Sequence, residues 1–114
     1  MKEALHQLLD HHLPIDGLAA WSVRLPDRTL TSQCFADWFT PAQVEQVLAR
    51  LALAEDSLAH HGIKAVRSCW KFEHARVYLV LRPDGACLAL FAENRPGLPA
   101  APFEAALEAF ARLA

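Results

Sequence analysis

Residues 77–92 read VYLVLRPDGACLALFA, two apolar runs on either side of a turn sequence. In Arg82-Pro83-Asp84-Gly85 the proline fixes one φ angle and Gly85 is free to take a positive φ, so a tight turn is predicted. Neither run alternates apolar with polar residues, which is typical of strands that are covered on both faces. The stretch therefore predicts two central strands of a sheet, with further structure packed on each side.

The run before this hairpin, residues 66–73, does alternate. Val66, Ser68, Trp70 and Phe72 share one set of positions, and Arg67, Cys69, Lys71 and Glu73 share the other. A tight turn at His74-Ala75 joins this run to the strand that follows. Because one of its faces is basic, we expect it to be an exposed strand at the edge of the sheet.

A second hairpin is predicted between Leu18 and Phe35. Trp21, Val23 and Leu25 share one face of the first strand, while Ser22 and Arg24 share the other. Leu25-Pro26-Asp27-Arg28 suits a type I turn. The returning run, from Thr29 to Phe35, is less apolar than its neighbour and is therefore expected at a sheet edge.

Three helices are predicted. Residues 2–13 carry leucines at helical spacing and end before Pro14, because the residue before a proline avoids the α region. Thr40, Pro41 and Gln43 form a capping box that starts a long helix, which runs to about His61 and ends at Gly62. Pro102 opens the last helix, whose apolar stripe consists of Phe103, Leu107, Phe110 and Leu113.

The predicted order is thus α-β-β-α-β-β-β-α, and the fold class is α/β (α+β). Residues 1–114 form a single domain, a five-stranded antiparallel sheet sandwiched between helices. The last helix follows the central strands and is expected to cover one face of the sheet. The long middle helix is expected to cover the other face.

Composition excludes several functional classes. The chain has 114 residues, 54% of them apolar, with 11 basic and 13 acidic residues and a net charge of −2, so the basic surplus of a nucleic-acid-binding protein is missing. No apolar run approaches the ~20 residues that cross a bilayer, and the N-terminus does not resemble a signal peptide. Three widely spaced cysteines in apolar runs favour a reducing compartment, so we expect a cytoplasmic protein.

The middle helix has a broader apolar surface than a helix needs to pack on one sheet. Together with the exposed edge strand, this surface predicts a homodimer, because a symmetric partner would cover both features. The alternative is that the alanines of the helix reflect helix preference and that Arg67 and Lys71 guard the edge. The residues expected at a dimer or partner interface are Val47, Arg50, Leu51, Ala54, Leu58, Arg67, Cys69, Lys71 and Trp38, of which Trp38 is equally well explained as a lid on the core.

The sequence offers no recognisable catalytic constellation, and we expect no enzyme, cofactor or metal. The doublets His11-His12 and His60-His61 point their adjacent side chains in different directions, and separated pairs of the zinc-binding kind are missing. Cys69, between Arg67 and Lys71, lacks the surroundings of a cysteine nucleophile. No serine lies in a nucleophile elbow, and no glycine-rich loop is available to cradle phosphate.

The sequence resembles the roadblock/dynein light chain family along its whole length. The stretch from Ile15 to Val23 is similar to the family's G-V-x-G-x-x-V approach to the first strand, and the long helix from Pro41 and the hairpin from Tyr78 to Ala92 fit as well. One departure is Pro26-Asp27-Arg28, where the family usually has Asp-Gly.

The resemblance implies a non-catalytic homodimer, in which the middle helices pack together and the third strands pair across the two-fold axis. It implies a regulator or adaptor for a small Ras-like GTPase, or for a motor or scaffold complex. Two alternatives remain open. One is a small-molecule sensor of the profilin-like or PAS-like kind, which needs a cavity between sheet and helix. The other is a binding protein similar to a secretion chaperone.

Overall fold

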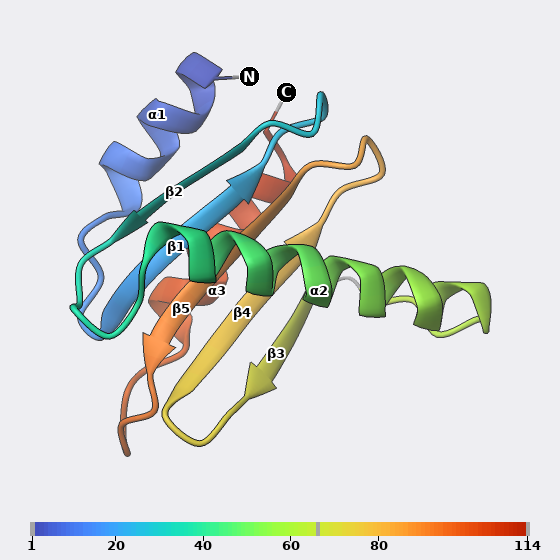
Figure 1. Cartoon of the computed structure of the whole chain (residues 1–114). Coiled ribbons are helices and arrows are strands. Elements are labelled where there is room, and N and C mark those ends of the chain that lie inside the picture. The colour runs from blue at the N-terminus through green and yellow to red at the C-terminus, as the bar shows by residue number, and fades with distance from the viewer. Residues whose placement is uncertain (1, 66, 114) are drawn as a thin grey trace.

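The computed structural model describes residues 2–65 and 67–113, which form a five-stranded antiparallel sheet with three helices packed on it (Figure 1). The strands lie in the order β2-β1-β5-β4-β3. The elements along the chain are α1 (Lys2–His12), β1 (Leu18–Arg24), β2 (Leu30–Cys34), α2 (Pro41–His60), β3 (Arg67–Lys71), β4 (Ala75–Leu81), β5 (Cys87–Glu93) and α3 (Ala101–Ala111). The predicted fold class and element order are confirmed.

The hairpin at residues 77–92 forms the interior of the sheet, as predicted. β5 lies between β1 and β4, and nearly all of its residues are buried on both faces. At the turn Gly85 has a φ of +91°, which favours glycine. The carboxylate of Asp84 accepts a hydrogen bond of 3.0 Å from the N–H of Ala86, so the turn is held by its own side chain.

The first hairpin differs from the expectation in one respect. β2 is an edge strand, as predicted, but β1 is buried on both faces, because α1 and α3 cover one face and α2 covers the other. Ser22 therefore lies in the interior in spite of its hydroxyl group, and no solvated polar face exists there. Gly17 precedes β1 with a φ of +86°, and a Cβ atom at this position would meet the side chain of Leu98 at 2.6 Å. The position thus requires glycine.

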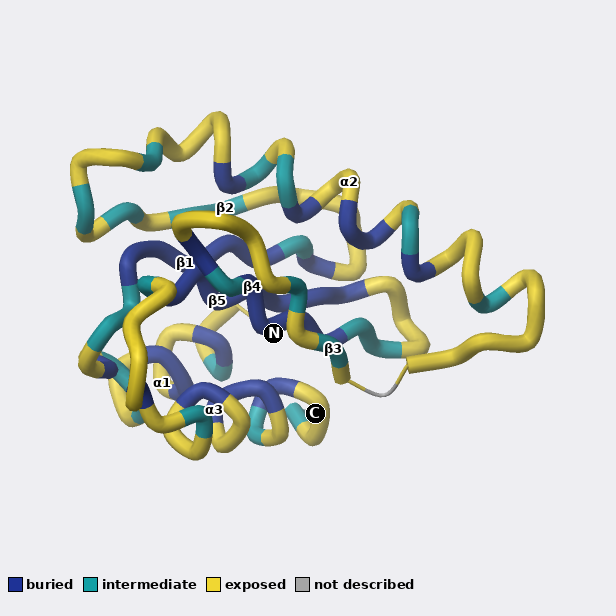
Figure 2. Tube along the Cα trace, turned by 90° about the horizontal axis from the view of Figure 1, so that it is seen from below, coloured by how far each residue is buried: buried dark blue, intermediate teal, exposed yellow. Residues whose placement is uncertain are grey.

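The helices divide between the two faces of the sheet, which gives three layers (Figure 2). α1 and α3 lie side by side on one face, and their apolar side chains pack with Trp21, Tyr78 and Leu88. α2 alone covers the opposite face, where Val44 and Leu48 contact the other core cluster. The prediction that the middle and last helices cover opposite faces is confirmed. No helix in the described part of the chain is long and apolar enough to span a bilayer.

The start of α2 is fixed by the predicted capping box. The Oγ1 atom of Thr40 accepts a hydrogen bond from the N–H of Gln43 at 3.2 Å, and the Oε1 atom of Gln43 accepts one from the N–H of Thr40 at 2.9 Å. The helix ends at His60, and Gly62 follows with a φ of +80°. The C-terminal part of α2 extends beyond β3, so the sheet does not support it there (Figure 1).

The third strand is shorter than expected. Phe72 and Glu73, predicted as strand residues, form the turn that leads to β4, while Val66 lies outside the described residues. β3 pairs with β4 along one side only and is an edge of the sheet, which confirms the prediction.

Candidate interaction surface

An apolar groove opens on the face of the sheet that α2 covers, next to the first half of that helix. Its volume is about 370 Å³, within the range of pockets that hold small molecules or single large side chains. The lining residues come from the loop before α2, from α2, from the β3–β4 turn and from the two central strands: Trp38, Phe39, Val47, Phe72, Glu73, His74, Ala75, Val77 and Phe91. Except for Glu73 and His74, these residues are apolar, so the groove suits an apolar group.

Two aromatic residues before α2 form one side of the groove. Phe39 precedes the capping box and packs its ring edge-to-face against Phe91, with 5.3 Å between the ring centroids. The ring of Trp38 lies 4.6 Å from that of Phe39 and remains 44% exposed. Trp38 is therefore a surface residue at the mouth of the groove, supported from below by Phe39.

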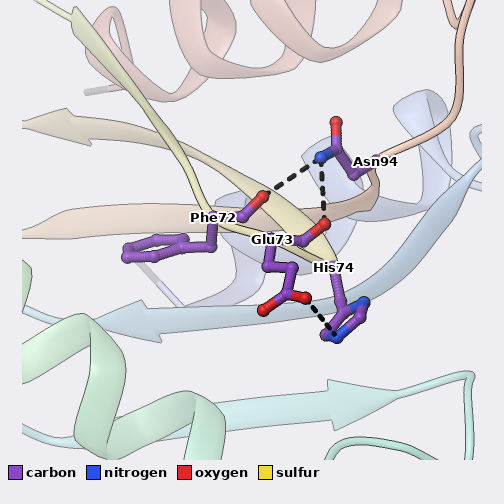
Figure 3. A network of polar contacts seen from close by, with 4 residues as sticks. All are labelled: Phe72, Glu73, His74 and Asn94. Carbon is purple, nitrogen blue, oxygen red and sulfur yellow. Dashed lines mark hydrogen bonds and ion pairs between the residues drawn. The ribbon is translucent and has the colours of Figure 1, made fainter.

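The β3–β4 turn on the other side is held by a polar network (Figure 3). The side-chain amide of Asn94, just after β5, donates hydrogen bonds to the carbonyls of Phe72 (3.1 Å) and Glu73 (3.2 Å). Arg76 in turn donates from Nε to the Oδ1 atom of Asn94 at 3.2 Å. The ring of Phe72 points away from Asn94 and is 47% exposed (Figure 3). The network thus fixes the backbone from which an exposed aromatic ring projects.

The ion pair between Glu73 and His74 in the same turn is a surface contact. The Nε2 atom of His74 lies 3.7 Å from the Oε1 atom of Glu73, and both side chains are more than four-fifths exposed (Figure 3). Exposed pairs of this kind contribute little to stability. The turn is therefore held by Asn94 and not by these charges.

The outer side of β3 offers backbone groups at every second residue. The N–H of Phe72 donates to the carbonyl of Ala75 at 2.8 Å, which closes the β3–β4 hairpin. Because bonded and non-bonded pairs alternate along an antiparallel ladder, Trp70 and Ser68 also bond to β4. The remaining positions, Arg67, Cys69 and Lys71, direct their N–H and C=O groups away from β4, toward the free edge.

A stripe of predicted interface residues runs along α2. Val47, Leu51, Ala54 and Leu58 follow one another at helical spacing on one side of the helix. Val47 and Ala54 are half-buried, Leu58 is 37% exposed and Arg50 is exposed, so these side chains reach the surface. Leu51 is only 7% exposed and belongs to the core beneath α2, which leaves it no free surface.

The structure places the two groups of predicted interface residues on opposite faces of the sheet. Cys69 lies opposite Tyr78 in the ladder, and Tyr78 packs on the side of α1 and α3. Arg67, Cys69 and Lys71 therefore project to that side, while α2 lies on the other. The β3 residues on the α2 side are Ser68 and Trp70, and Trp70 is half-buried in the cluster beneath the helix. The free backbone edge of β3 lies between the α2 residues on one face and Arg67, Cys69 and Lys71 on the other.

Sequence reasoning missed Phe72 and Trp70 as parts of this surface. Both lie in the alternating run 66–73, on the apolar side, and an apolar side on an edge strand is itself a signal of contact. The groove had no comparable signal, because its lining comes from segments far apart in the sequence.

The three cysteines are free thiols, and burial raises the pKa of each. At Cys69, desolvation raises the pKa, Arg76 and Lys71 oppose this rise, and Glu104 adds to it. At Cys34, burial acts together with the charge of Glu45. A raised pKa leaves less thiolate at neutral pH, so none of these thiols has the activation of a cysteine nucleophile.

The histidine doublets lie at helix ends, as expected. The Nδ1 atom of His60 is 2.8 Å from the carbonyl of Asp56, one turn earlier in α2, and the rings of His11 and His12 meet edge-on at 5.0 Å. Among residues 2–65 and 67–113, no three side chains of histidine, cysteine, aspartate or glutamate lie close enough together to hold a metal ion.

No protein-family model matches the chain, and no curated protein is similar to it in sequence at a significant level. Several solved structures resemble it in fold. The gliding protein MglB from Thermus thermophilus is 20% identical, with a TM-score of 0.69 over 98% of this chain and 89% of that one. An MglB with a tetrameric arrangement is 19% identical, with a TM-score of 0.66 over 99% and 88%. A Roadblock/LC7 domain from Streptomyces avermitilis is 12% identical, with a TM-score of 0.64 over 98% and 92%. These likenesses confirm the roadblock-like fold that the sequence predicts.

Proposed function

We propose that the protein is a non-catalytic, homodimeric adaptor or regulatory platform in the cytoplasm that binds a small Ras-like GTPase or a scaffold protein. The observation that carries the proposal is the free edge of β3 beside the overhanging end of α2 (Figure 1). An unpaired edge and an unsupported helix with apolar side chains are both features that a second protein chain stabilises by covering them.

In a homodimer, a second copy of the chain covers both the free edge of β3 and the overhanging end of α2. In a two-fold arrangement, the edge of β3 pairs with the same edge of the second copy, and the overhanging end of each α2 extends over the other copy's sheet. The side chains of Leu58 and Ala54 then leave water and contact the second copy. Self-association is known on this fold, because one of the similar structures is an MglB in a tetrameric arrangement.

The choice of a GTPase or scaffold as partner rests on the resemblance of the sequence to the roadblock family. The apolar groove supplies a place for a large side chain of such a partner, with Trp38 and Phe72 on its two sides. Tryptophan is among the residue types that contribute most to binding, and phenylalanine is enriched at the cores of interfaces.

The test is direct binding of the purified protein to purified small Ras-like GTPases, each loaded with GDP or with a non-hydrolysable GTP analogue. We expect binding that depends on the nucleotide and is weakened at least tenfold by Phe72→Ala. Leu53→Ala, on a 70% exposed residue of α2 outside the groove lining, serves as the matched control. Equal affinity of both variants for every GTPase that binds would contradict the role of the groove.

A small-molecule sensor remains the second candidate, because the groove lies between sheet and helix, as such a function needs. Its lining is almost entirely apolar, so it favours an apolar ligand without a strong charge. Titration with the uncharged fluorescent probe Nile red separates the two functions. Saturable binding with one site per chain, lost in Val47→Trp, favours the sensor.

A further inference from the structure

We propose that a cleft between α1 and the β1–β2 hairpin binds a small carboxylate with an apolar chain, such as a medium-chain fatty acid. The carboxylate accepts a hydrogen bond from the indole N–H of Trp21 and lies near the ammonium group of Lys2. The cleft is on the opposite face of the sheet from the apolar groove beside α2. The inference therefore stands apart from the proposed function.

One wall of the cleft is α1. Four of its residues line the cleft at spacings of three or four, so they share one face of the helix: Lys2, Leu5, His6 and Leu9. Leu5 and Leu9 are buried, whereas Lys2 and His6 are exposed. The interior of this wall is thus apolar, and its rim is polar.

The other wall is the β1–β2 hairpin. Trp21 and Leu25 are buried side chains of this wall, and residues 29–31 complete it. The turn is fixed by its own hydrogen bonds, because the N–H of Thr29 donates to the Oδ1 atom of Asp27 at 2.9 Å and the N–H of Leu25 donates to the carbonyl of Thr29 at 2.9 Å. The cleft has a volume of about 260 Å³, slightly below the usual range of ligand pockets, so it suits a small molecule.

The indole N–H of Trp21 has no acceptor. Its Nε1 atom is the single buried side-chain nitrogen or oxygen without a hydrogen-bond partner in residues 2–65 and 67–113, and the residue is only 7% exposed. An indole nitrogen can donate but not accept, and a buried donor without an acceptor destabilises the fold. Such groups are rare in folded proteins. The free donor therefore indicates a ligand that brings an acceptor into the cleft.

A small movement at the rim gives a ligand access to this donor. The Nε1 atom is out of contact with water, so a side chain that lines the cleft has to move before an acceptor reaches it. Leu30 is 38% exposed, and Lys2 and His6 are exposed as well. Exposed side chains change rotamer within nanoseconds, and these three can do so while the core stays packed.

The charges around the cleft favour an anion. Lys2 is positive, and none of the residues that line the cleft is acidic. The N–H of Thr29 lowers the pKa of Asp27, and the charge of Lys2 lowers it further, so Lys2 acts on anions at this end of the cleft. Asp27 itself is exposed, and water screens its competition for Lys2. Because hydrogen bonds to ionised acceptors are stronger than those to neutral ones, Trp21 favours a carboxylate over an alcohol.

The test is a titration of the intact ¹⁵N-labelled protein with sodium octanoate, below its critical micelle concentration, followed through the indole N–H resonances. Trp21→Phe assigns the resonance of Trp21. We expect this resonance to move downfield and to saturate, while those of Trp38 and Trp70 stay in place. Isothermal titration calorimetry should give one octanoate per chain. The uncharged analogue 1-octanol should bind at least about tenfold more weakly.

Variants locate the site. Trp21→Phe should weaken octanoate binding about tenfold, and Lys2→Gln roughly two- to fivefold. Lys64→Gln, on an exposed lysine outside the lining of the cleft, is the matched control and should leave the affinity unchanged. Thr31→Trp fills the cleft and should abolish binding, whereas Val47→Trp fills the groove beside α2 and should not affect it. Circular dichroism checks that each variant is folded, and Lys2→Gln provides the test if Trp21→Phe does not fold.

Three results would overturn the proposal. The first is a wild-type protein that does not bind octanoate. The second is binding that shifts the resonance of Trp38 and is lost in Val47→Trp, because octanoate then occupies the groove. The third is equal affinity of the wild type and Lys2→Gln together with equal affinity for octanoate and 1-octanol, because the carboxylate is then not recognised.

Discussion

Cys69 in β3 lies directly opposite Tyr78 in β4, in a pair whose backbone groups do not bond to each other. The ring of Tyr78 stacks on Phe103 of α3 at 4.9 Å, so the Cys69 side chain is placed on the α3 side of the sheet. At the same time its N–H and C=O groups point outward, along the plane of the sheet. The side chain of Cys69 thus faces the α3 side of the sheet, while its backbone groups are directed to the free edge of β3.

Cys69→Pro should convert the dimer into a folded monomer. The N–H of Cys69 makes no bond to β4, so proline removes only the donor that a second copy would use, and prolines are tolerated on such edges. Size-exclusion chromatography should show loss of the dimer while circular dichroism shows the wild-type fold. Trp70→Pro is the contrasting variant, because it removes an N–H that bonds to β4 and should destabilise the fold itself. A Cys69→Pro protein that stays dimeric would contradict pairing at this edge.

Lys71→Glu should strengthen the dimer. Where β3 pairs antiparallel with β3 of a second copy so that Arg67 of each copy stands opposite Lys71 of the other, the change replaces two like-charge pairs with two opposite-charge pairs, each worth about 0.2–1 kcal/mol. The dissociation constant at low ionic strength should fall by roughly 2- to 30-fold, as measured by analytical ultracentrifugation. Combining it with Arg67→Glu restores like charges and should return the affinity to near the wild-type value. A weaker dimer in Lys71→Glu would exclude this placement of Arg67 opposite Lys71.

A higher salt concentration should lower the dissociation constant of the wild-type dimer, as Lys71→Glu should. Because screening reduces the repulsion between Arg67 and Lys71, self-association should tighten as ionic strength rises. The measurement is the dissociation constant at several salt concentrations, and the effect should disappear or reverse in Lys71→Glu. Tightening of equal size in both proteins would assign the salt effect to apolar contacts.

Leu58→Asp should weaken self-association at least tenfold, because it places a charge on the apolar stripe of α2 where the helix extends beyond the sheet. Leu53→Asp is the matched control, since Leu53 is 70% exposed on the same helix but lies off the stripe. Both variants should unfold at nearly the wild-type temperature when studied as monomers. Equal loss of the dimer in both would show that the stripe has no special role.

Thiol labelling should follow burial, exposure and pKa. Cys69 is exposed and should react first with iodoacetamide, whereas Cys87 is buried in β5 and should react only on unfolding. Since the pKa of Cys69 is raised above its ordinary value, the thiolate fraction at neutral pH is reduced, and its labelling should accelerate as pH rises beyond the ordinary thiol range. Dimer formation should protect Cys69, so its labelling should be slower in the wild-type dimer than in Leu58→Asp at a concentration where that variant is monomeric, as peptide mass spectrometry measures.

Much of the fold follows from local signals in the sequence. The turn at Asp84-Gly85 and the apolar runs on either side predict the central strands, and the capping box at Thr40 places the start of α2 at the correct residue. These features depend on neighbouring residues alone, so no knowledge of tertiary structure is needed. Burial of Ser22 was not predicted, because it depends on α2 packing on that face of β1, a contact between segments far apart in the sequence.

The candidate surface was predicted only in part. Alternation in the run 66–73 separates Trp70 from Cys69, but deciding which of them faces α2 requires the pairing with β4. The apolar stripe of α2 was identified, although Leu51 turns out to be buried against the sheet. The groove combines the loop at Trp38 with the β3–β4 turn at Phe72, and only the folded chain brings these segments together.

The central claim is that two copies of the chain associate through β3 and α2. The most direct measurement is the solution mass by multi-angle light scattering across a hundredfold dilution in the micromolar range. The account predicts a mass of twice the 12.7 kDa of one chain, which persists on dilution in the wild type and falls to the single-chain value in Cys69→Pro. A wild-type protein with the mass of one chain at every concentration would contradict it.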